Sequence, residues 1–410
     1  MKFNSKLFFR WLLIVSLVMM ISYTVFQNFA FSNLETAPES SLKAEETPPT
    51  KETPNYRFLL ADEVALLEND IQKKAKRYAI NGSVLIGYKD QILYEGDFGY
   101  RDPTKKTPMQ AGLSYQLASV SKQFTAAAVL RLHEKGLLHI NDTVAKHLPN
   151  FKFENVTIKD LLKHRSGLWD YMYLTERYWE KDIAPNNLEV VDLINEHEAR
   201  LNFTPGRFFS YSNTGYVVLG GIVEQVTGLH LGEFISKEFL NPLCLDHTFT
   251  KKNKFNKELI LKGYQPYRRS FIELPAGFHN NAIGDKGIYA SARDLHTWFR
   301  ELKNGKILNT SSVDLMFGRN KYGKNNRYGM GFRLRNETGE PVVFHNGLWD
   351  GFRNGLVYYP ERELVVIVMT HTQNKRKYYF QKQILQSAKT LLQQGEKRLD
   401  LEMTTKELIQ

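Results

Sequence analysis

The stretch ASVSKQFTAAAV, residues 118–129, places two serines and one lysine at the start of an apolar, alanine-rich segment. Its spacing predicts a helix that begins at Ser119 and ends at Gly136. Ser119 and Lys122 are three residues apart and therefore share one face of that helix. A serine at a helix start often serves only as a cap. A serine and a lysine on one face also fit a nucleophile beside its base.

The position at a helix start favours the chemical interpretation. The N–H groups and the dipole at a helix N-terminus favour negative charge, and the N–H of Ser119 can stabilise a developing oxyanion. A desolvated Lys122 could take the serine proton, whereas Ser121 points to another face. The spacing alone is not specific, because a second Ser-x-x-Lys occurs at residues 40–43 in a polar segment.

Composition places the chain among globular proteins. Its 410 residues are 42% hydrophobic and 24% charged, enough for one large domain or two smaller ones. The formal net charge is +11, but the basic residues are scattered, so we expect solvated faces and no nucleic-acid partner. Cys244 is the only cysteine, which excludes an intrachain disulfide and a cysteine zinc site; its apolar neighbours indicate a core position. The sequence lacks His-Glu-x-x-His and Gly-x-Ser-x-Gly, and we predict no metal site.

Residues 1–33 form a separate N-terminal segment. Three basic residues precede an apolar run from Trp11 to about Phe31, the length of a membrane span. Cleavage after Ala30 would put Asn28 at the −3 position, which is unfavourable, so we favour a retained membrane anchor. The positive flank then stays in the cytoplasm and the rest of the chain lies outside it, in the cell envelope. Cleavage, the alternative, would give a secreted or periplasmic protein.

Residues 34–55 are rich in Glu, Pro and Thr and predict a disordered linker. We expect one globular domain over residues 56–395 and a polar C-terminal tail over residues 396–410. Strand pairs around turns are predicted at residues 82–100 and 355–371, and helices at residues 65–80 and 378–394. The pattern from Ser119 to about His230 is mostly helical. We therefore predict an α/β (α+β) fold, with one sheet built from both ends of the chain, flanking terminal helices and an inserted all-α subdomain.

Two further motifs follow the serine motif along the chain. Tyr211-Ser212-Asn213 is the only Tyr-x-Asn; a tyrosine near a lysine can relay a proton, and an asparagine can hold a substrate amide. The same residues also form turns. His345-Asn346-Gly347 follows a strand-like run, but His-x-Gly recurs at His230 in a helical connection. Each motif alone is therefore weak evidence.

The three motifs in this order resemble those of the serine β-lactamase and penicillin-binding protein superfamily. The resemblance is closest to the class C-like branch, which includes D-alanyl-D-alanine carboxypeptidases, esterases and β-lactamase-related hydrolases. It extends from about Tyr56 to Gln394 and includes the segments LLKHRSGLWDY, TPGRFFSYSNTGYVVLG, GDKGIYASARDL and YGMGF. It implies an antiparallel sheet of N- and C-terminal strands, an all-α part, and an active site between them.

The resemblance also implies roles for the first two motifs. Ser119 is the nucleophile that becomes acylated, and Lys122 activates it. Tyr211 is the proton relay or general base, and Asn213 positions the substrate carbonyl and Lys122. The family uses no metal or organic cofactor.

The third motif is assigned to the substrate. His345 and Gly347 lie near the leaving group or substrate carboxylate, and the N–H of Leu348 joins that of Ser119 in the oxyanion hole. Arg353 could hold a substrate carboxylate or lie on a surface strand. His164 is interpreted as structural, with Gly167 as the cap of a helix end.

One departure from the family pattern bears on function. Where β-lactamases carry a lysine in the third motif, this chain has His345, which is neutral much of the time at neutral pH. We therefore predict a cell-envelope serine hydrolase acting through an acyl-enzyme on Ser119, either a D-amino-acid peptidase of the carboxypeptidase type or an esterase. Its substrate would be a small molecule or peptide such as a peptidoglycan fragment. A weak β-lactamase and a non-catalytic penicillin-binding or peptidoglycan-sensing protein are the alternatives, and the sequence does not indicate an oligomeric state.

Overall fold

The computed structural model describes residues 59–250, 257–318 and 327–409. The predicted membrane anchor and linker, residues 1–33 and 34–55, lie outside these ranges. Within them, no helix combines the length and apolar character needed to cross a bilayer.

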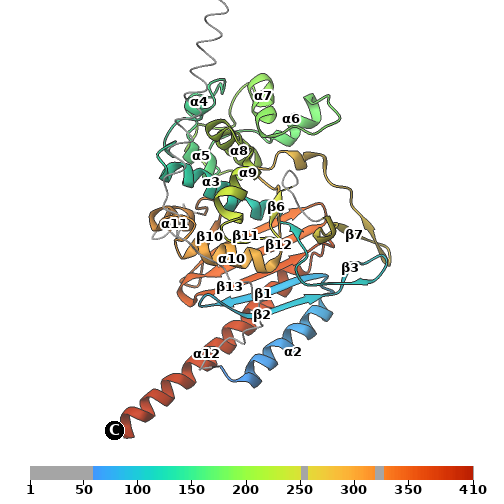
Figure 1. Cartoon of the computed structure of the whole chain (residues 1–410), viewed down its shortest axis with the longest axis vertical. Coiled ribbons are helices and arrows are strands. Elements are labelled where there is room, and N and C mark those ends of the chain that lie inside the picture. The colour runs from blue at the N-terminus through green and yellow to red at the C-terminus, as the bar shows by residue number, and fades with distance from the viewer. Residues whose placement is uncertain (1–58, 251–256, 319–326, 410) are drawn as a thin grey trace, which may run out of the picture. The chain divides into compact units, whose positions relative to one another are not determined.

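A six-stranded antiparallel sheet in the order β10-β11-β12-β13-β1-β2 forms the centre of the domain (Figure 1). The N-terminal strand β1 pairs along its whole length with the C-terminal strand β13, so the prediction of one sheet built from both ends is confirmed. In the β1–β2 turn, Lys89 and Asp90 both have positive φ, as a two-residue hairpin turn requires. The strands are β1 (Gly82–Tyr88), β2 (Gln91–Phe98), β10 (Arg333–Glu337), β11 (Glu340–Trp349), β12 (Phe352–Tyr359) and β13 (Leu364–Thr370).

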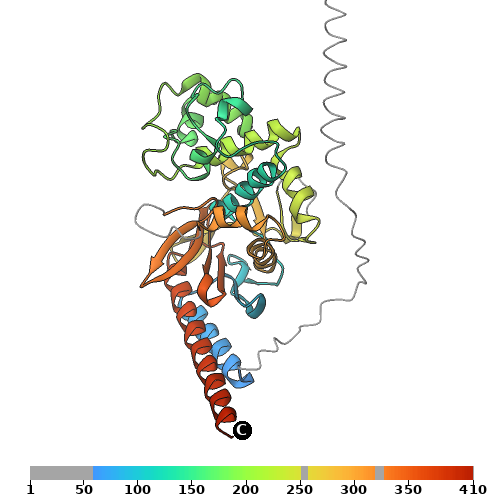
Figure 2. The same ribbon diagram turned by 90° about the vertical axis from the view of Figure 1, so that its left-hand side faces the viewer.

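Helices α2 (Ala61–Arg77) and α12 (Lys377–Ile409) lie side by side against one face of the sheet (Figures 1 and 2). Ile71 of α2 and Ile384 of α12 share a buried cluster with valines of β1 and β13. α12 continues through residues 396–409 of the segment expected to form a polar tail, which are mostly good helix formers. Arg398 in this part of α12 pairs with Glu63 of α2.

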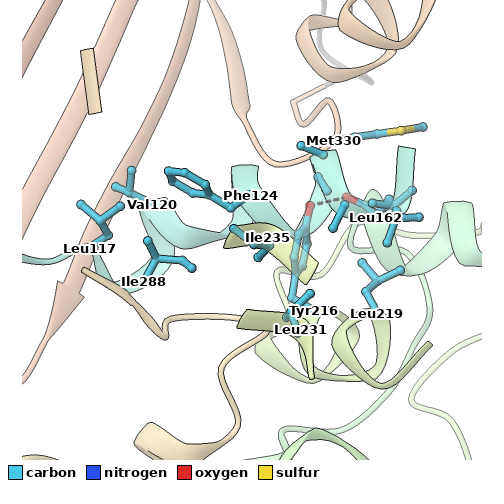
Figure 3. Close-up of a cluster of buried hydrophobic side chains, with 14 of the residues drawn as sticks. Leu117, Val120, Phe124, Leu162, Tyr216, Leu219, Leu231, Ile235, Ile288 and Met330 are labelled. Carbon is cyan, nitrogen blue, oxygen red and sulfur yellow. Dashed lines mark hydrogen bonds between the residues drawn. The ribbon is translucent and has the colours of Figure 1, made fainter. Parts of the chain in front are cut away.

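The other face of the sheet packs on α3 (Lys122–Glu134) and α10 (Ala292–Lys303). Phe124 of α3 stacks on Trp298 of α10 with ring centroids 4.1 Å apart. α3 is buried along most of its length among residues of the helical region, Tyr216 included (Figure 3). That region was predicted and comprises α4 (Val144–His147), α5 (Ile158–Leu162), α6 (Tyr171–Tyr178), α7 (Asn187–His197), α8 (Asn213–Thr227), α9 (Leu231–Ile235) and the π-helical turn η2 (Ser236–Leu240).

Short elements connect the sheet and the helical region. Cys244, at the end of that region, is exposed, which corrects the expectation of a core position. The remaining strands are β3 (Tyr100–Asp102), β4 (Thr107–Pro108), β5 (Tyr115–Gln116), β6 (Phe249–Thr250), β7 (Tyr264–Tyr267), β8 (Ser270–Glu273) and β9 (Ile288–Ala290). The remaining helical elements are α11 (Thr310–Phe317) and the 3-10 turns η1 (Ala118–Ser121), η3 (Lys257–Leu259), η4 (Phe278–Asn281) and η5 (Pro360–Arg362).

Candidate active site

Ser119 lies in the tight turn that leads from β5 into α3. The sequence predicted an α-helix from Ser119, but residues 118–121 form the 3-10 turn η1 and α3 begins at Lys122. The N–H of Val120 bonds to the oxygen of Leu117, as the tighter turn requires, and Ala118 has a φ of 51°. Ser119 is half-buried and remains at the surface of the site.

Lys122 is fully buried, and its Nζ has three oxygen neighbours. It donates to the Oγ of Ser119 at 3.3 Å and to the Oδ1 of Asn213 at 2.8 Å. The third acceptor is the main-chain oxygen of Asp285 at 3.0 Å. Lys122 therefore lies within reach of the serine hydroxyl, the geometry a general base needs.

Asn213 is the first residue of α8, and Tyr211 lies two residues before it. The side chain of Ser212 caps this helix by accepting from the N–H of Gly215 at 3.4 Å. The centroid of the Tyr211 ring lies 5.2 Å from the Nζ of Lys122. The Tyr211 hydroxyl is buried and has no hydrogen-bond partner among the described residues. Because an unpaired buried hydroxyl is costly, a substrate atom that pairs with it is favoured.

His164 holds Tyr211 in place. Its main-chain oxygen accepts from the N–H of Ser210 at 2.9 Å, and its Nδ1 accepts from the N–H of Ser212 at 3.1 Å. The rings of His164 and Tyr211 lie 4.3 Å apart. Burial, followed by the charge of Lys122, holds the pKa of His164 well below its usual range, so the ring is neutral. His164 is thus structural, as expected, but it supports a motif residue.

The chain around His164 differs from the prediction in one respect. α5 ends earlier than expected, and Lys163 rather than Gly167 is its C-cap. His164 itself has a φ of 55°, and Gly167 lies in the loop that follows. The His-Arg-Ser-Gly segment that contains His164 was recognised by its family resemblance. No pattern in the sequence indicated that His164 holds Tyr211 in place.

His345 of the third motif is buried in β11. Its Nδ1–H donates to the oxygen of Asn346 at 2.8 Å, and its Nε2 accepts from the hydroxyl of Tyr328 at 3.1 Å. Burial, then the charges of Lys122 and Arg333, hold the pKa of His345 well below its usual range. His345 therefore supplies no fixed positive charge at neutral pH.

Gly347 lets strand β11 approach η1, the turn that contains Ser119. A Cβ at this position would overlap the main-chain oxygen of Leu117, so only glycine fits without a shift. The peptide N–H of Leu348 follows directly, while the Leu348 side chain is 53% exposed. Its predicted place in the oxyanion hole remains a prediction.

Arg353 does not lie in this cleft, which corrects the expectation for it. It shares a face of β12 with Gly355, where a Cβ would overlap the Nζ of Lys377 in α12. His345 pairs with Leu356, the residue after Gly355, and both face the other way. Arg353 therefore points toward α12 and away from the site.

Arg333 of β10 is the cation that the sequence analysis missed. Its guanidinium carbon lies 4.5 Å from the centroid of the Tyr211 ring. No carboxylate of the described residues forms an ion pair with Arg333 in this structure. Arg333 directly follows the YGMGF segment, but a lone basic residue at a strand start gives no specific signal.

The arrangement fits acyl transfer by a serine nucleophile. It brings Ser119, Lys122, Tyr211 and Asn213 together, with His345 on a neighbouring strand. The described part of the chain has no group of three or more His, Cys, Asp or Glu residues placed to hold a metal ion.

Comparison with known proteins gives the same assignment. The profile of the Beta-lactamase family matches residues 67–387. Penicillin-binding protein 4* of Bacillus subtilis is 29% identical over 342 residues, which cover 80% of this chain and 75% of that protein. Protein flp of Staphylococcus aureus is 27% identical over 316 residues, 75% of this chain and 62% of that protein. The octameric penicillin-binding protein homologue from Pyrococcus abyssi superposes with a TM-score of 0.65 and 26% identity, covering 77% of this chain and 75% of that one. The chain belongs to the β-lactamase family and is a serine hydrolase of the β-lactamase and penicillin-binding protein superfamily.

Proposed function

We propose that this protein is an exported carboxypeptidase-type hydrolase that cleaves peptides ending in a D-amino acid, through an acyl-enzyme on Ser119. The observation that carries the proposal is the position of Lys122, whose Nζ lies between the Oγ of Ser119 and the Oδ1 of Asn213. The similarity to penicillin-binding proteins supports a peptidoglycan-derived substrate. Ester hydrolysis is the second candidate, because the same nucleophile and base serve both bonds.

The reaction follows from the site in two halves. Lys122, acting as the base with Tyr211, accepts the proton of Ser119 while the Oγ forms a bond to the substrate carbonyl carbon. The N–H groups of Ser119 and Leu348 would stabilise the oxyanion. The intermediate collapses by expelling the amine, which takes a proton from Tyr211 or Lys122 and leaves an ester on Ser119. Water, deprotonated by the same groups, then hydrolyses this ester.

Arg333 supports a substrate with a free carboxylate. It is a cation beside Tyr211 that pairs with no acidic side chain among the described residues, and neutral His345 does not supply that charge. A C-terminal D-amino acid carries a carboxylate on the leaving group, which a guanidinium can bind through two hydrogen bonds. The carboxylate of a penicillin would bind in the same way, so we expect a slowly released acyl-enzyme with β-lactams.

The proposed location rests on the sequence of residues 1–33. A basic start followed by a membrane-length apolar run favours an anchor with the hydrolase domain outside the cytoplasm. Protease added to spheroplasts should digest the domain. Protection from protease until the membrane is broken would contradict this location.

A hydrolysis panel tests the function. The purified protein is offered D-Ala-D-Ala peptides, p-nitrophenyl acetate and butyrate, and a chromogenic cephalosporin. We expect the peptides to give the highest kcat/KM, and Lys122→Ala and Tyr211→Phe each to slow acylation by roughly 10²–10⁴. Preference for the esters would select the second candidate. Undiminished turnover by folded Ser119→Ala would refute the acyl-enzyme mechanism.

A further inference from the structure

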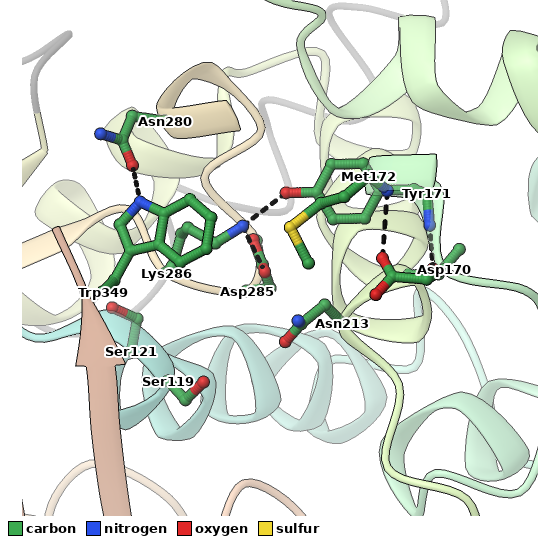
Figure 4. A network of polar contacts seen from close by, with 12 residues as sticks. Ser119, Ser121, Asp170, Tyr171, Met172, Asn213, Asn280, Asp285, Lys286 and Trp349 are labelled. Atoms are coloured by element: carbon green, nitrogen blue, oxygen red, sulfur yellow. Dashed lines mark hydrogen bonds and ion pairs between the residues drawn. The ribbon is translucent and has the colours of Figure 1, made fainter. Parts of the chain in front are cut away.

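A buried ion pair lies directly beside the catalytic lysine. Lys286 and Asp285 are 3% and 0% exposed, and the Nζ of Lys286 lies 2.8 Å from the Oδ2 of Asp285. The same Nζ donates to the hydroxyl of Tyr171 at 2.6 Å and lies 4.5 Å from the centroid of the Trp349 ring (Figure 4). Lys286 therefore links α6 of the helical region to the end of β11, next to the third motif.

Asp285 connects this pair to catalysis. Its main-chain oxygen accepts from Lys122, while its carboxylate pairs with Lys286. The preceding residue is also fixed, because the oxygen of Gly284 accepts from Thr125 at 2.7 Å and its N–H donates to Asn187 at 3.2 Å. The main-chain carbonyl of Asp285, which accepts from Lys122, is thus held in position by hydrogen bonds of the neighbouring residue.

The pair also places two opposite charges on the segment that holds Lys122. In a buried site, an unopposed carboxylate beside Lys122 would favour its protonated form, which cannot accept the serine proton. The ammonium of Lys286 opposes that effect. The other polar groups around Lys122 are Ser119 from η1, Tyr211 just before α8, Asn213 and Tyr216 in α8, His164 after α5, His345 from β11 and, beyond Tyr211, Arg333 from β10.

Two of these neighbours contribute little charge. Burial lowers the pKa of both His164 and His345, so both rings are neutral at neutral pH. The remaining charged groups near Lys122 in the described structure are Arg333 and the Asp285–Lys286 pair. We therefore expect the balance of charge within that pair to influence Lys122 as a base.

We propose that Lys286 is a positioning residue, which neutralises Asp285 beside Lys122 and anchors the Asp285 carbonyl through Tyr171 and Trp349. This rests on the proposed role of Lys122 as the base for Ser119. We assign Lys286 no step in the chemistry, because in the described structure its Nζ pairs with Asp285 and Tyr171 and forms no hydrogen bond to Ser119.

The test uses opposite changes in the pair. Asp285→Asn keeps the main-chain oxygen but leaves the Lys286 cation unopposed, so the acidic limb of the pH–rate profile should move to lower pH. Lys286→Met leaves the carboxylate unopposed, so the limb should move to higher pH. Each shift should be about one pH unit, and the double variant should lie between the two. The measured rate is the second-order labelling of Ser119 by a fluorophosphonate probe from pH 5 to 10.

Lys377→Met is the matched control. Lys377 is similarly buried, but it is the first residue of α12, on the other face of the sheet, and donates to Gln381. We expect its pH–rate profile to match that of the wild type. Lys286→Met on its own leaves a buried charge unpaired and could lose its fold. In that case, a comparison of the double variant with Asp285→Asn still isolates the effect of the Lys286 charge. We expect the acidic limb of the pH–rate profile to lie at higher pH in the double variant.

The possible outcomes separate this inference from the proposed function. If wild-type Ser119 is not labelled at all, the acyl-enzyme proposal fails. If labelling is normal and folded variants show unshifted limbs, or shifts in one common direction, the charge-balancing role of Lys286 is refuted while the function stands. Opposite shifts with the control unchanged support the role.

Discussion

The guanidinium carbon of Arg333 lies 4.5 Å from the centroid of the Tyr211 ring, which places a cation beside the proposed proton relay. Arg333→Gln removes that charge from the cleft. We expect KM for a D-Ala-D-Ala peptide to rise about tenfold or more, because a charge-assisted hydrogen bond is lost, and KM for p-nitrophenyl acetate to change little.

A second arginine on the same strand provides the control for this measurement. Arg335 pairs with Glu337 at 2.7 Å and stacks on Phe344, so Arg335→Gln should leave both KM values unchanged. Equal loss of peptide and ester hydrolysis in Arg333→Gln would mean that Arg333 supports Tyr211 rather than a substrate carboxylate.

The two serines of the opening motif should differ sharply in labelling. Ser121 is fully buried, and its Oγ accepts from the N–H of Ile288 at 3.1 Å, so its function is structural. We expect mass spectrometry to place a fluorophosphonate or penicillin adduct on Ser119. Ser119→Ala should abolish labelling, whereas Ser121→Ala should keep most of it and lower stability by about 1–3 kcal/mol, because a buried N–H loses its partner. An adduct on Ser121 would overturn the assignment.

The clamp on Tyr211 predicts an effect without substrate contact. His164→Leu removes the acceptor for the Ser212 N–H, so Tyr211 should be less well ordered. We expect kcat for the preferred substrate to fall about tenfold or more with a small change in KM, since a misplaced proton relay slows chemistry more than binding. His147→Leu is the control. It also removes a histidine with a polar partner, Asp142 at 2.9 Å, but His147 lies in α4 and not beside Tyr211. Equal losses in both variants would indicate general destabilisation instead.

Much of this site could be predicted from the sequence, because the catalytic residues lie within short motifs at fixed spacings. Ser119 and Lys122 are neighbours by helical geometry, and Tyr211 and Asn213 lie at one helix start. The strand pairs and terminal helices followed from periodicity and turns. These features depend on local sequence, which a single chain displays directly.

The errors about the cations of the site and the start of α3 concern contacts between distant segments. Arg333 was missed and Arg353 was considered for the site, and only the pairing register shows that Arg353 faces α12. Lys286 lies in the GDKGIYASARDL segment, but the residues that contact its Nζ, Tyr171 and Trp349, are far away in sequence. The start of α3 shifted to Lys122 where the Ser121 hydroxyl bonds to β9.

Gly347 should be intolerant of substitution for a steric reason. A methyl group at this position would overlap the oxygen of Leu117 and force β11 away from η1. We expect Gly347→Ala to lower kcat/KM by roughly 10² or more, because a small displacement of oxyanion donors is costly. A normal far-ultraviolet spectrum and cooperative melting would verify the fold. Activity within threefold of wild type would show that the strand can shift without harm.

Stability at acid pH should depend on His296 of α10. The absence of a side chain at Gly87 leaves room for its ring, which is 2% exposed. Burial, then the charge of Arg300, lowers the pKa of His296 to about 4. In the unfolded chain a histidine takes up a proton near pH 6.5. Between these two pH values the unfolded state binds more protons than the folded state. His296 therefore does not destabilise the fold above pH 6.5, and the free energy of unfolding falls as the pH drops below 6.5.

Urea unfolding of the wild type and of His296→Gln at pH 7.5 and 5.0 measures the contribution of His296 to the free energy of unfolding. We expect the wild type to lose about 2 kcal/mol more than the variant between these values. The comparison is needed because other groups act in the opposite direction; burial raises the pKa of Glu198 to about 7, which favours folding at low pH. The difference between the two proteins cancels that contribution. Parallel pH dependences would show that the His296 ring is hydrated or becomes protonated without unfolding.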